Sequence, residues 1–175
     1  RRQRQMCIRD RYHEGVIVMS ACLGGEVPQH ILGGHPERAE ETVRWFKNIF
    51  GEDYYLEVQL HQTDDPNANR ETFVQQLAVN EVIYDIAERT GVKVVATNDV
   101  HFVNQEDATA HDMLICLGTK RDLDDPQRMR YSQQEWLKTQ EEMNAVFADR
   151  PELLSNTLEI LNKVEFYSIE NPALM

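Results

Sequence analysis

From Gly15 onward, short apolar segments alternate with amphipathic helical segments, and this alternation is the feature that most restricts the fold. Segments rich in β-branched or aromatic residues have the length and pattern of strands at residues 16–19, 54–60 and 92–96. Segments with apolar residues at helical spacing separate them, at residues 27–32, 36–50 and 70–89. Strands that alternate with helices are typical of a parallel sheet or a β/α barrel, so the sequence predicts an α/β fold.

The helix that ends near Arg89 is closed by Gly91. It carries apolar residues that we expect in the core: Phe73, Leu77, Ile83, Ile86 and Ala87.

After the third expected strand, the pattern becomes mainly helical. Asn104 is an N-cap residue for a helix that ends at Gly118, and a charged loop follows at residues 123–131. Ser132 and Thr139 each stand three residues before a glutamate, and this spacing predicts two capped helix starts. A last helix is expected from about Arg150.

An aspartate and a histidine stand two residues apart where the third expected strand ends. Residues i and i+2 of a strand point the same way, so Asp99 and His101 can converge beyond the carboxyl end of a parallel sheet. A carboxylate oxygen and a neutral imidazole nitrogen are both ordinary ligands of zinc or manganese. Two ligands do not make a site, and an Asp-x-His pair also marks a simple turn with a hydrogen-bonded histidine. On the residues alone, both interpretations stay open.

Other polar residues in these segments have an ordinary and a functional interpretation. Glu57 interrupts a strand that alternates with period two, either as a solvated or salt-bridged carboxylate or as an acid facing a pocket near a metal. For His111, a hydrogen-bonded histidine between helices is favoured over a ligand, because its helix should lead away from the sheet. Cys116 is expected to be a small core residue, among Leu114 and Leu117.

The charge balance limits the classes of partner. Against 18 basic residues stand 30 acidic ones, and the net charge of −12 argues against a surface built to grip phosphate backbones. No apolar run approaches the roughly 20 residues of a membrane span, so we expect a soluble protein without membrane contact. Cys7, Cys22 and Cys116 are odd in number and form no C-x-x-C pair, which favours a reducing compartment.

The amino terminus differs from the rest of the chain. Residues 1–11 are basic, lack helical or strand periodicity, and have no apolar region of a signal peptide. We interpret them as a non-native leader and exclude them from the fold prediction; a basic arm for nucleic acid is the alternative.

Several segments, in order, resemble the polymerase-and-histidinol-phosphatase (PHP) domain of the alpha subunit of bacterial DNA polymerase III. They are residues 17–28, 94–102, 107–112, 123–131 and 156–160. The resemblance implies a distorted β/α barrel, of which residues 12–122 would form the carboxyl-terminal part. Residues 123–175 would be a loop and helical extension toward the polymerase core. The family's first ligand motif, a His-x-His, would lie upstream and the palm carboxylates downstream, so we expect an internal fragment.

The same resemblance implies a metal cluster at the strand ends. Cys22, Asp99 and His101 fall on ligand positions of that cluster, and Glu57 and Asn98 are expected to line its pocket. The metal would be zinc or manganese, while magnesium would serve the palm site outside this chain. In metal-binding members the domain is associated with 3'-to-5' exonuclease activity, in which a metal-activated water attacks a phosphodiester. No catalytic residue is assigned within this fragment.

The implied setting is the bacterial cytoplasm, with DNA, the proofreading subunit and the sliding clamp as partners of the full polymerase. One alternative is a metal-free scaffold that docks the proofreading subunit. Another is a stand-alone phosphatase of the same fold, and the polymerase-like residues 123–160 count against it.

Overall fold

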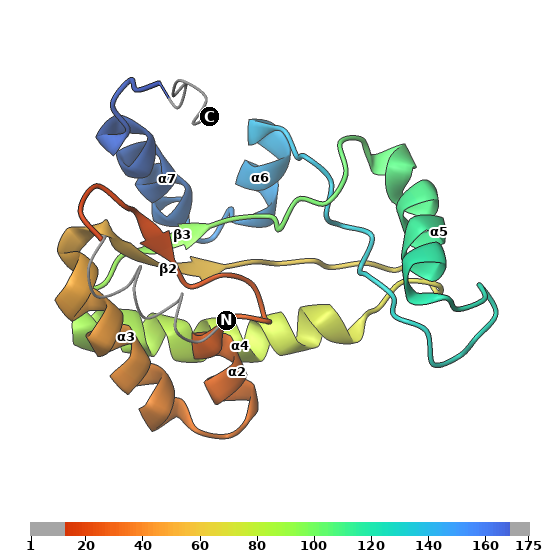
Figure 1. The fold of residues 1–175 in the computed structure, drawn as a ribbon, viewed down its shortest axis with the longest axis horizontal. Helices are drawn as coiled ribbons and strands as arrows, with labels where there is room; N and C mark the ends of the chain where they lie inside the picture. Colours follow the sequence, from red (N-terminus) through yellow and green to blue (C-terminus); the bar gives the residue numbers. More distant parts are fainter. Residues whose placement is uncertain (1–12, 169–175) are drawn as a thin grey trace, which may run out of the picture.

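The computed structural model describes residues 13–168, in which a small parallel sheet lies between helices (Figure 1). Its strands are β1 (Val18–Met19), β2 (Tyr54–Val58) and β3 (Val94–Ala96), in the order β1-β2-β3. Both neighbouring pairs are parallel, with Met19 opposite Tyr55 and Glu57 opposite Val95. The predicted mixture of strands and helices around a parallel sheet is confirmed. The expected leader, residues 1–11, lies outside the described residues.

Helices cover both faces of the sheet (Figure 1). One face carries α2 (Glu26–Leu32), α3 (Pro36–Phe50) and α4 (Glu71–Thr90), and a 3-10 turn, η1 (Gly51–Asp53), joins α3 to β2. The opposite side carries α6 (Gln140–Val146) and α7 (Glu152–Lys163). A further 3-10 turn, η2 (Gln105–Asp107), leads into α5 (Ala108–Thr119), which stands beyond the carboxyl ends of the strands.

The core forms where α3 and α4 pack on β2. Leu56 is fully buried, and the neighbouring Tyr55 points to the other face, where its hydroxyl donates a 2.8 Å hydrogen bond to Glu159 of α7. Both faces of β2 are therefore covered, as expected for a parallel strand between two layers of helices. The buried apolar cluster consists of Val27, Ala39, Val43, Tyr54, Leu56, Val58, Val79, Ile83, Ile86, Val92, Val94, Ala96, Phe147 and Leu153.

Two residues of that cluster, Phe147 and Leu153, come from the expected extension. Helix α7 is also tied to the sheet by Asn156, whose side-chain amide donates a 2.8 Å hydrogen bond to the carbonyl of Val94. The extension thus shares its core with the sheet, and the division at residues 122 and 123 stays a prediction.

Helix α4 places polar residues in the core where an apolar one was expected. Ile83 and Ile86 are buried as predicted, but Leu77 is 47% exposed. Gln76 is buried instead, because its side-chain oxygen accepts a 2.7 Å hydrogen bond from the backbone N–H of His61. Asn80 is buried in the same way and donates to the Gln59 carbonyl at 3.0 Å. Both amides satisfy backbone groups just past the end of β2, which explains their burial.

Of the two predicted helix starts, one forms and one does not. Thr139 and Glu142 make a reciprocal capping box at the start of α6, as predicted. The helix expected at Ser132 is wrong: residues 132–138 contain no helical turn, the chain bends at Gln133, and Trp136 pairs with Phe102. Gln133 has a φ of +63°, which no right-handed helix allows.

Helix α5 is buried less than its sequence indicates. Cys116 is buried, as expected, but Leu114 and Leu117 are 63% and 76% exposed. The helix is anchored through Asp112, whose carboxylate accepts two hydrogen bonds from the buried Arg128 guanidinium, at 2.6 and 2.7 Å. None of the helices between residues 13 and 168 combines the length and apolar character needed to cross a membrane.

Candidate metal centre

Two tight turns follow β1 and β3 at the same edge of the sheet. The turn after β1 contains Ala21 with a φ of +65°, and the turn after β3 contains Asp99 with a φ of +44°. For residues other than glycine, left-handed backbone costs about 1–2 kcal/mol, and such strain concentrates at functional sites. Gly25 closes the first turn so tightly that a Cβ there would come within 2.2 Å of the Ser20 carbonyl oxygen.

These turns place the side chains of Cys22 and Asp99 on the wall of one cavity. Burial raises the pKa of the Cys22 thiol, a backbone hydrogen bond from Gly24 opposes the rise, and the nearby Asp99 carboxylate adds to it. A thiolate and a carboxylate on the wall of the same cavity would repel each other. A cation bound by both would remove that repulsion, and metal binding would release the thiol proton.

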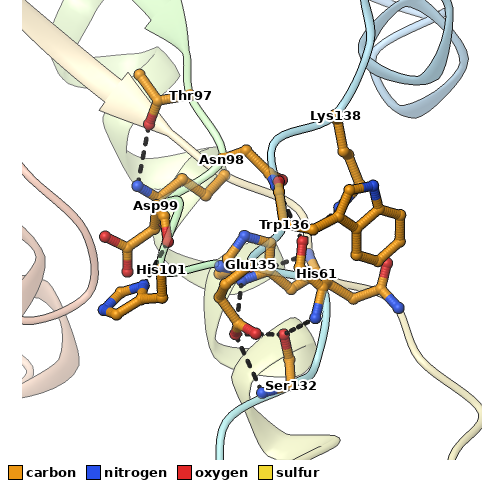
Figure 2. Close-up of polar contacts among 12 residues, drawn as sticks. His61, Thr97, Asn98, Asp99, His101, Ser132, Glu135, Trp136 and Lys138 are labelled. Carbon is orange, nitrogen blue, oxygen red and sulfur yellow. Dashed lines mark hydrogen bonds and ion pairs between the residues drawn. The ribbon is translucent and has the colours of Figure 1, made fainter. Parts of the chain in front are cut away.

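His101 is oriented by the main chain of the same loop. Its Nδ1 lies 2.5 Å from the Asp99 carbonyl oxygen, which can only accept, so Nδ1 carries the proton. In the neutral ring, Nε2 then has a free lone pair. Metal-binding histidines are commonly oriented by such a hydrogen bond from the other ring nitrogen. Figure 2 shows the Asp99 carboxylate and the His101 ring on the same side of the loop.

The structure brings together part of the predicted ligand set. A cavity of about 250 Å³ is lined by Cys22, Asp99 and Tyr131, whereas His101 lies beside it, with its ring 4.8 Å from that of Tyr131. Thiol, carboxylate and imidazole donors suit zinc. No group of three or more such side chains in residues 13–168 is close enough to hold an ion.

His111 lies nearer to this loop than its helix suggested. Its ring packs 5.7 Å from the ring of His101 and 5.0 Å from that of Tyr131. The expectation that α5 carries His111 away from the sheet end is therefore wrong, because the first turn of α5 packs the His111 ring against His101 and Phe102 of the loop after β3.

The two residues expected to line a pocket have different surroundings. Glu57 is half-buried, and its carboxylate accepts hydrogen bonds from the Ala21 N–H at 2.5 Å and the Thr97 hydroxyl at 3.0 Å. Asn98 is buried, and its amide donates to the carbonyls of Gln134 and Trp136 at 2.9 and 2.8 Å (Figure 2). Both side chains fix neighbouring backbone, and a direct role in a metal pocket stays a prediction for each.

The sequence interpretation missed a buried pair in the wall of this cavity, His61 and Glu135. Each side chain is 2% exposed, and His61 Nδ1 lies 3.4 Å from Glu135 Oε1 (Figure 2). The Ser132 hydroxyl donates to the same oxygen at 2.5 Å. Burial alone would raise the pKa of Glu135, but the hydrogen bonds from His61 and Ser132 outweigh it and lower the pKa to about 2.

The sequence contained a signal for His61, which follows a predicted strand just as Asp99 does. It contained none for Glu135, since the Ser-x-x-Glu pattern suggested a helix cap. Glu135 also supports the loop after β3, because its backbone carbonyl accepts a 2.8 Å hydrogen bond from the His101 N–H.

Part of the sequence matches a known protein family. A parallel sheet with possible metal ligands at its carboxyl edge is consistent with this match. Residues 1–61 match the PHP domain family. Three curated relatives that the chain resembles are all one kind of protein. DNA polymerase III subunit alpha of Borreliella burgdorferi is 40% identical over 164 residues, which cover 93% of this chain. The same subunit of Treponema pallidum is 37% identical over 155 residues, covering 87%.

The corresponding protein of Thermus aquaticus is 38% identical over 151 residues, covering 84% of this chain. The chain is therefore homologous to a segment of bacterial DNA polymerase III alpha subunits, which confirms the family resemblance. It spans 13%, 12% and 12% of the length of these three relatives, respectively.

Proposed function

We propose that this chain supplies part of a metal-binding PHP domain in the alpha subunit of a bacterial replicative DNA polymerase. The complete protein would catalyse DNA-directed DNA synthesis in the cytoplasm, with DNA, a proofreading subunit and a sliding clamp as partners. The observation that carries the proposal is that Cys22 and Asp99, just past the carboxyl ends of β1 and β3, line the same cavity. This arrangement occurs in a chain that is related over 93% of its length to an alpha subunit.

In this proposal the three strands belong to a distorted β/α barrel. Parallel strands with their helices on the outside are the repeating unit of such barrels, and barrel sites lie at the carboxyl ends of the strands. Residues 12–122 would form the later part of the barrel, and residues 123–175 would lead toward the polymerase core.

Cys22 as thiolate, Asp99 as carboxylate and His101 through Nε2 would be the ligands that this chain contributes. Zinc or manganese at such a site supplies a more acidic water and polarises a phosphodiester oxygen. The main-chain carbonyl of Asp99 would keep the His101 ring in the tautomer that exposes Nε2. In the longer protein, the activity would be 3'-to-5' exonuclease cleavage; magnesium would serve the separate polymerase site.

Cobalt titration tests the ligand assignment, because a thiolate bound to Co²⁺ gives an intense near-ultraviolet charge-transfer band. We expect the full 175-residue chain to show a saturable band, and we expect Asp99→Ala or Cys22→Ser to remove it. The matched controls, Asp124→Ala in an exposed loop and Cys116→Ser in α5, should retain it. No saturable band, or an unchanged band in Asp99→Ala, would refute the assignment.

A metal-free scaffold that docks the proofreading subunit is the second candidate. It is favoured by the apolar face of α5, where Met113, Leu114 and Leu117 are 52%, 63% and 76% exposed. Metal analysis of a purified full-length alpha subunit containing this segment separates the two candidates. Stoichiometric zinc or manganese favours the nuclease-type site, and its absence favours the scaffold. The extent of the match to alpha subunits counts against a stand-alone phosphatase.

A further inference from the structure

Glu57 lies on the central strand, between the two turns that carry Cys22 and Asp99, and its carboxylate reaches both. One oxygen accepts the Ala21 N–H at 2.5 Å, in the residue next to Cys22. The other accepts the Thr97 hydroxyl at 3.0 Å, two residues before Asp99. The carboxylate therefore joins the ends of β1 and β3 across β2.

Further hydrogen bonds fix the direction of this bridge. Thr97 Oγ1 accepts a 3.0 Å hydrogen bond from the Gln59 side-chain amide, which leaves its own hydrogen free to donate to Glu57. On the other side, the Glu57 N–H donates to the Ser20 hydroxyl at 2.8 Å. The Thr97 hydroxyl is thus oriented toward the carboxylate, and together with the Ala21 N–H it presents two donors that an acceptor with two oxygens satisfies.

Both turns that Glu57 joins contain strained backbone. Ala21 and Asp99 both have positive φ, and neither is a glycine. Such conformations persist when the surrounding contacts determine them. The Ala21 N–H is one of the atoms held by Glu57, and the Thr97 hydroxyl holds the start of the turn that contains Asp99.

We propose that Glu57 is a positioning residue, which sets the separation of the Cys22 thiol and the Asp99 carboxylate for binding a zinc-like divalent cation. The proposal rests on the proposed function, because it takes these two residues as ligands. Glu57 itself is not a ligand in this proposal, since both of its oxygens are engaged by the turns.

The test compares Glu57→Gln with Glu159→Gln in the full chain. Glutamine keeps the shape of Glu57 but must turn an N–H₂ toward one of the two donors. Glu159 is a matched control, because its two oxygens also bind two partners, Tyr55 and Lys93, but at the opposite end of the sheet. Changes in residues that orient metal ligands typically lower metal affinity about 10–100-fold. We therefore expect Glu57→Gln to bind Co²⁺ about 10–100-fold more weakly than wild type. Glu159→Gln should bind Co²⁺ with unchanged affinity.

A purely structural role would lower the unfolding midpoint of both variants without changing the Co²⁺ affinity of the folded protein. Equal affinity in wild type and Glu57→Gln, or an equal loss in both variants, would therefore overturn the proposal. If Glu57→Gln does not fold, Thr97→Val removes one of the two donors while nearly preserving side-chain volume. The same criteria then apply to its Co²⁺ affinity.

Two measurements without metal separate this proposal from the proposed function. Hydrogen exchange at the Ala21 amide and iodoacetamide alkylation of Cys22, resolved peptide by peptide, report on the first turn directly. Both rates should rise at least severalfold in Glu57→Gln and stay unchanged in Glu159→Gln. If wild type binds no Co²⁺, the ligand assignment fails, and these rates decide whether Glu57 holds the turn. Unchanged rates in Glu57→Gln would overturn the positioning role.

Discussion

The two ends of the sheet are stabilised in different ways. At the amino end, charged side chains pair with one another: Lys163 with Asp53 at 3.0 Å, and Lys93 with Glu159. Lys93 and Glu159 are 47% and 33% exposed, so water competes with their pairing. At the carboxyl end, carboxylates and amides bind the main chain of turns instead, as Glu57 does with the Ala21 N–H.

This difference separates contacts that only add stability from contacts that determine geometry. When one partner of an exposed ion pair is removed, the backbone keeps its conformation. When a backbone N–H in a strained turn loses its acceptor, the conformation of the turn changes. Helix α4 follows the same division along its length. Ile83 and Ile86 pack on the sheet, and nearer the carboxyl ends of the strands Gln76 and Asn80 hold backbone groups.

The largest loss of stability should come from the apolar half of α4. Ile86 is completely buried, so Ile86→Ala should lower the free energy of unfolding by about 2–5 kcal/mol. Leu77→Ala in the same helix should change it by less than about 0.5 kcal/mol, because Leu77 is 47% exposed. Urea denaturation measures the free energy of unfolding of both variants. Equal losses in the two variants would contradict the distinction between the apolar and the polar half of α4.

A smaller, pH-dependent loss is expected for Glu135→Ala, which leaves polar groups of His61 and Ser132 without their partner. At pH 7 the cost should be about 1–3 kcal/mol. The folded pKa of about 2 lies below the ordinary value of 4.5, so the ionised carboxylate stabilises the fold above pH 4.5. That contribution is lost as the pH falls toward 2. Denaturation at several pH values should show the wild type and variant converging, and a gap that stays constant to pH 3 would contradict this pKa.

Ala21→Gly tests the strained turn and should raise stability by up to about 1 kcal/mol. Glycine relieves the positive φ but adds conformational entropy to the unfolded chain, so the net gain is small. Ala145→Gly, within helix α6, lacks that relief and should cost about 0.5–1 kcal/mol. Urea denaturation should show a higher free energy of unfolding for Ala21→Gly and a lower one for Ala145→Gly. A lower free energy of unfolding in both variants would show that Ala21 is not strained.

The smallest effect should follow Lys93→Met at the amino end. Removing one partner of an exposed pair should leave the unfolding midpoint almost unchanged, and added salt should abolish the remaining difference. A midpoint shift as large as that of Glu135→Ala would contradict the comparison between the two ends.

Local patterns in the sequence predicted the elements whose formation depends on local forces. Gly91 ends α4 in the left-handed conformation, and Thr139 with Glu142 caps α6, because each feature involves residues within one helical turn. The same pattern at Ser132 and Glu135 gave a wrong helix. There the glutamate carboxylate contacts His61, which is distant in sequence, and that contact cannot be recognised from a four-residue pattern.

The candidate site was predictable to a similar extent. Strand ends and spacing pointed to Asp99 and His101, and the family resemblance added Cys22. The spacing could not show that His101 would bond to the Asp99 carbonyl and lie outside the cavity lined by Cys22 and Asp99. Nor could it reveal Glu57 as a bridge, because a strand carboxylate has the same sequence signature whether it meets water or the donors of two turns.

The Asp112–Arg128 pair has a consequence for proteolysis. The pair closes an exposed loop that contains Lys120 and Arg121, two sites for trypsin. The Arg128 side chain is only 4% exposed. Buried ion pairs are screened little by salt. A chain cut after Arg121 would therefore remain one particle in a sizing column, held by this pair and by α7 on the sheet, and would separate into two fragments only on denaturation.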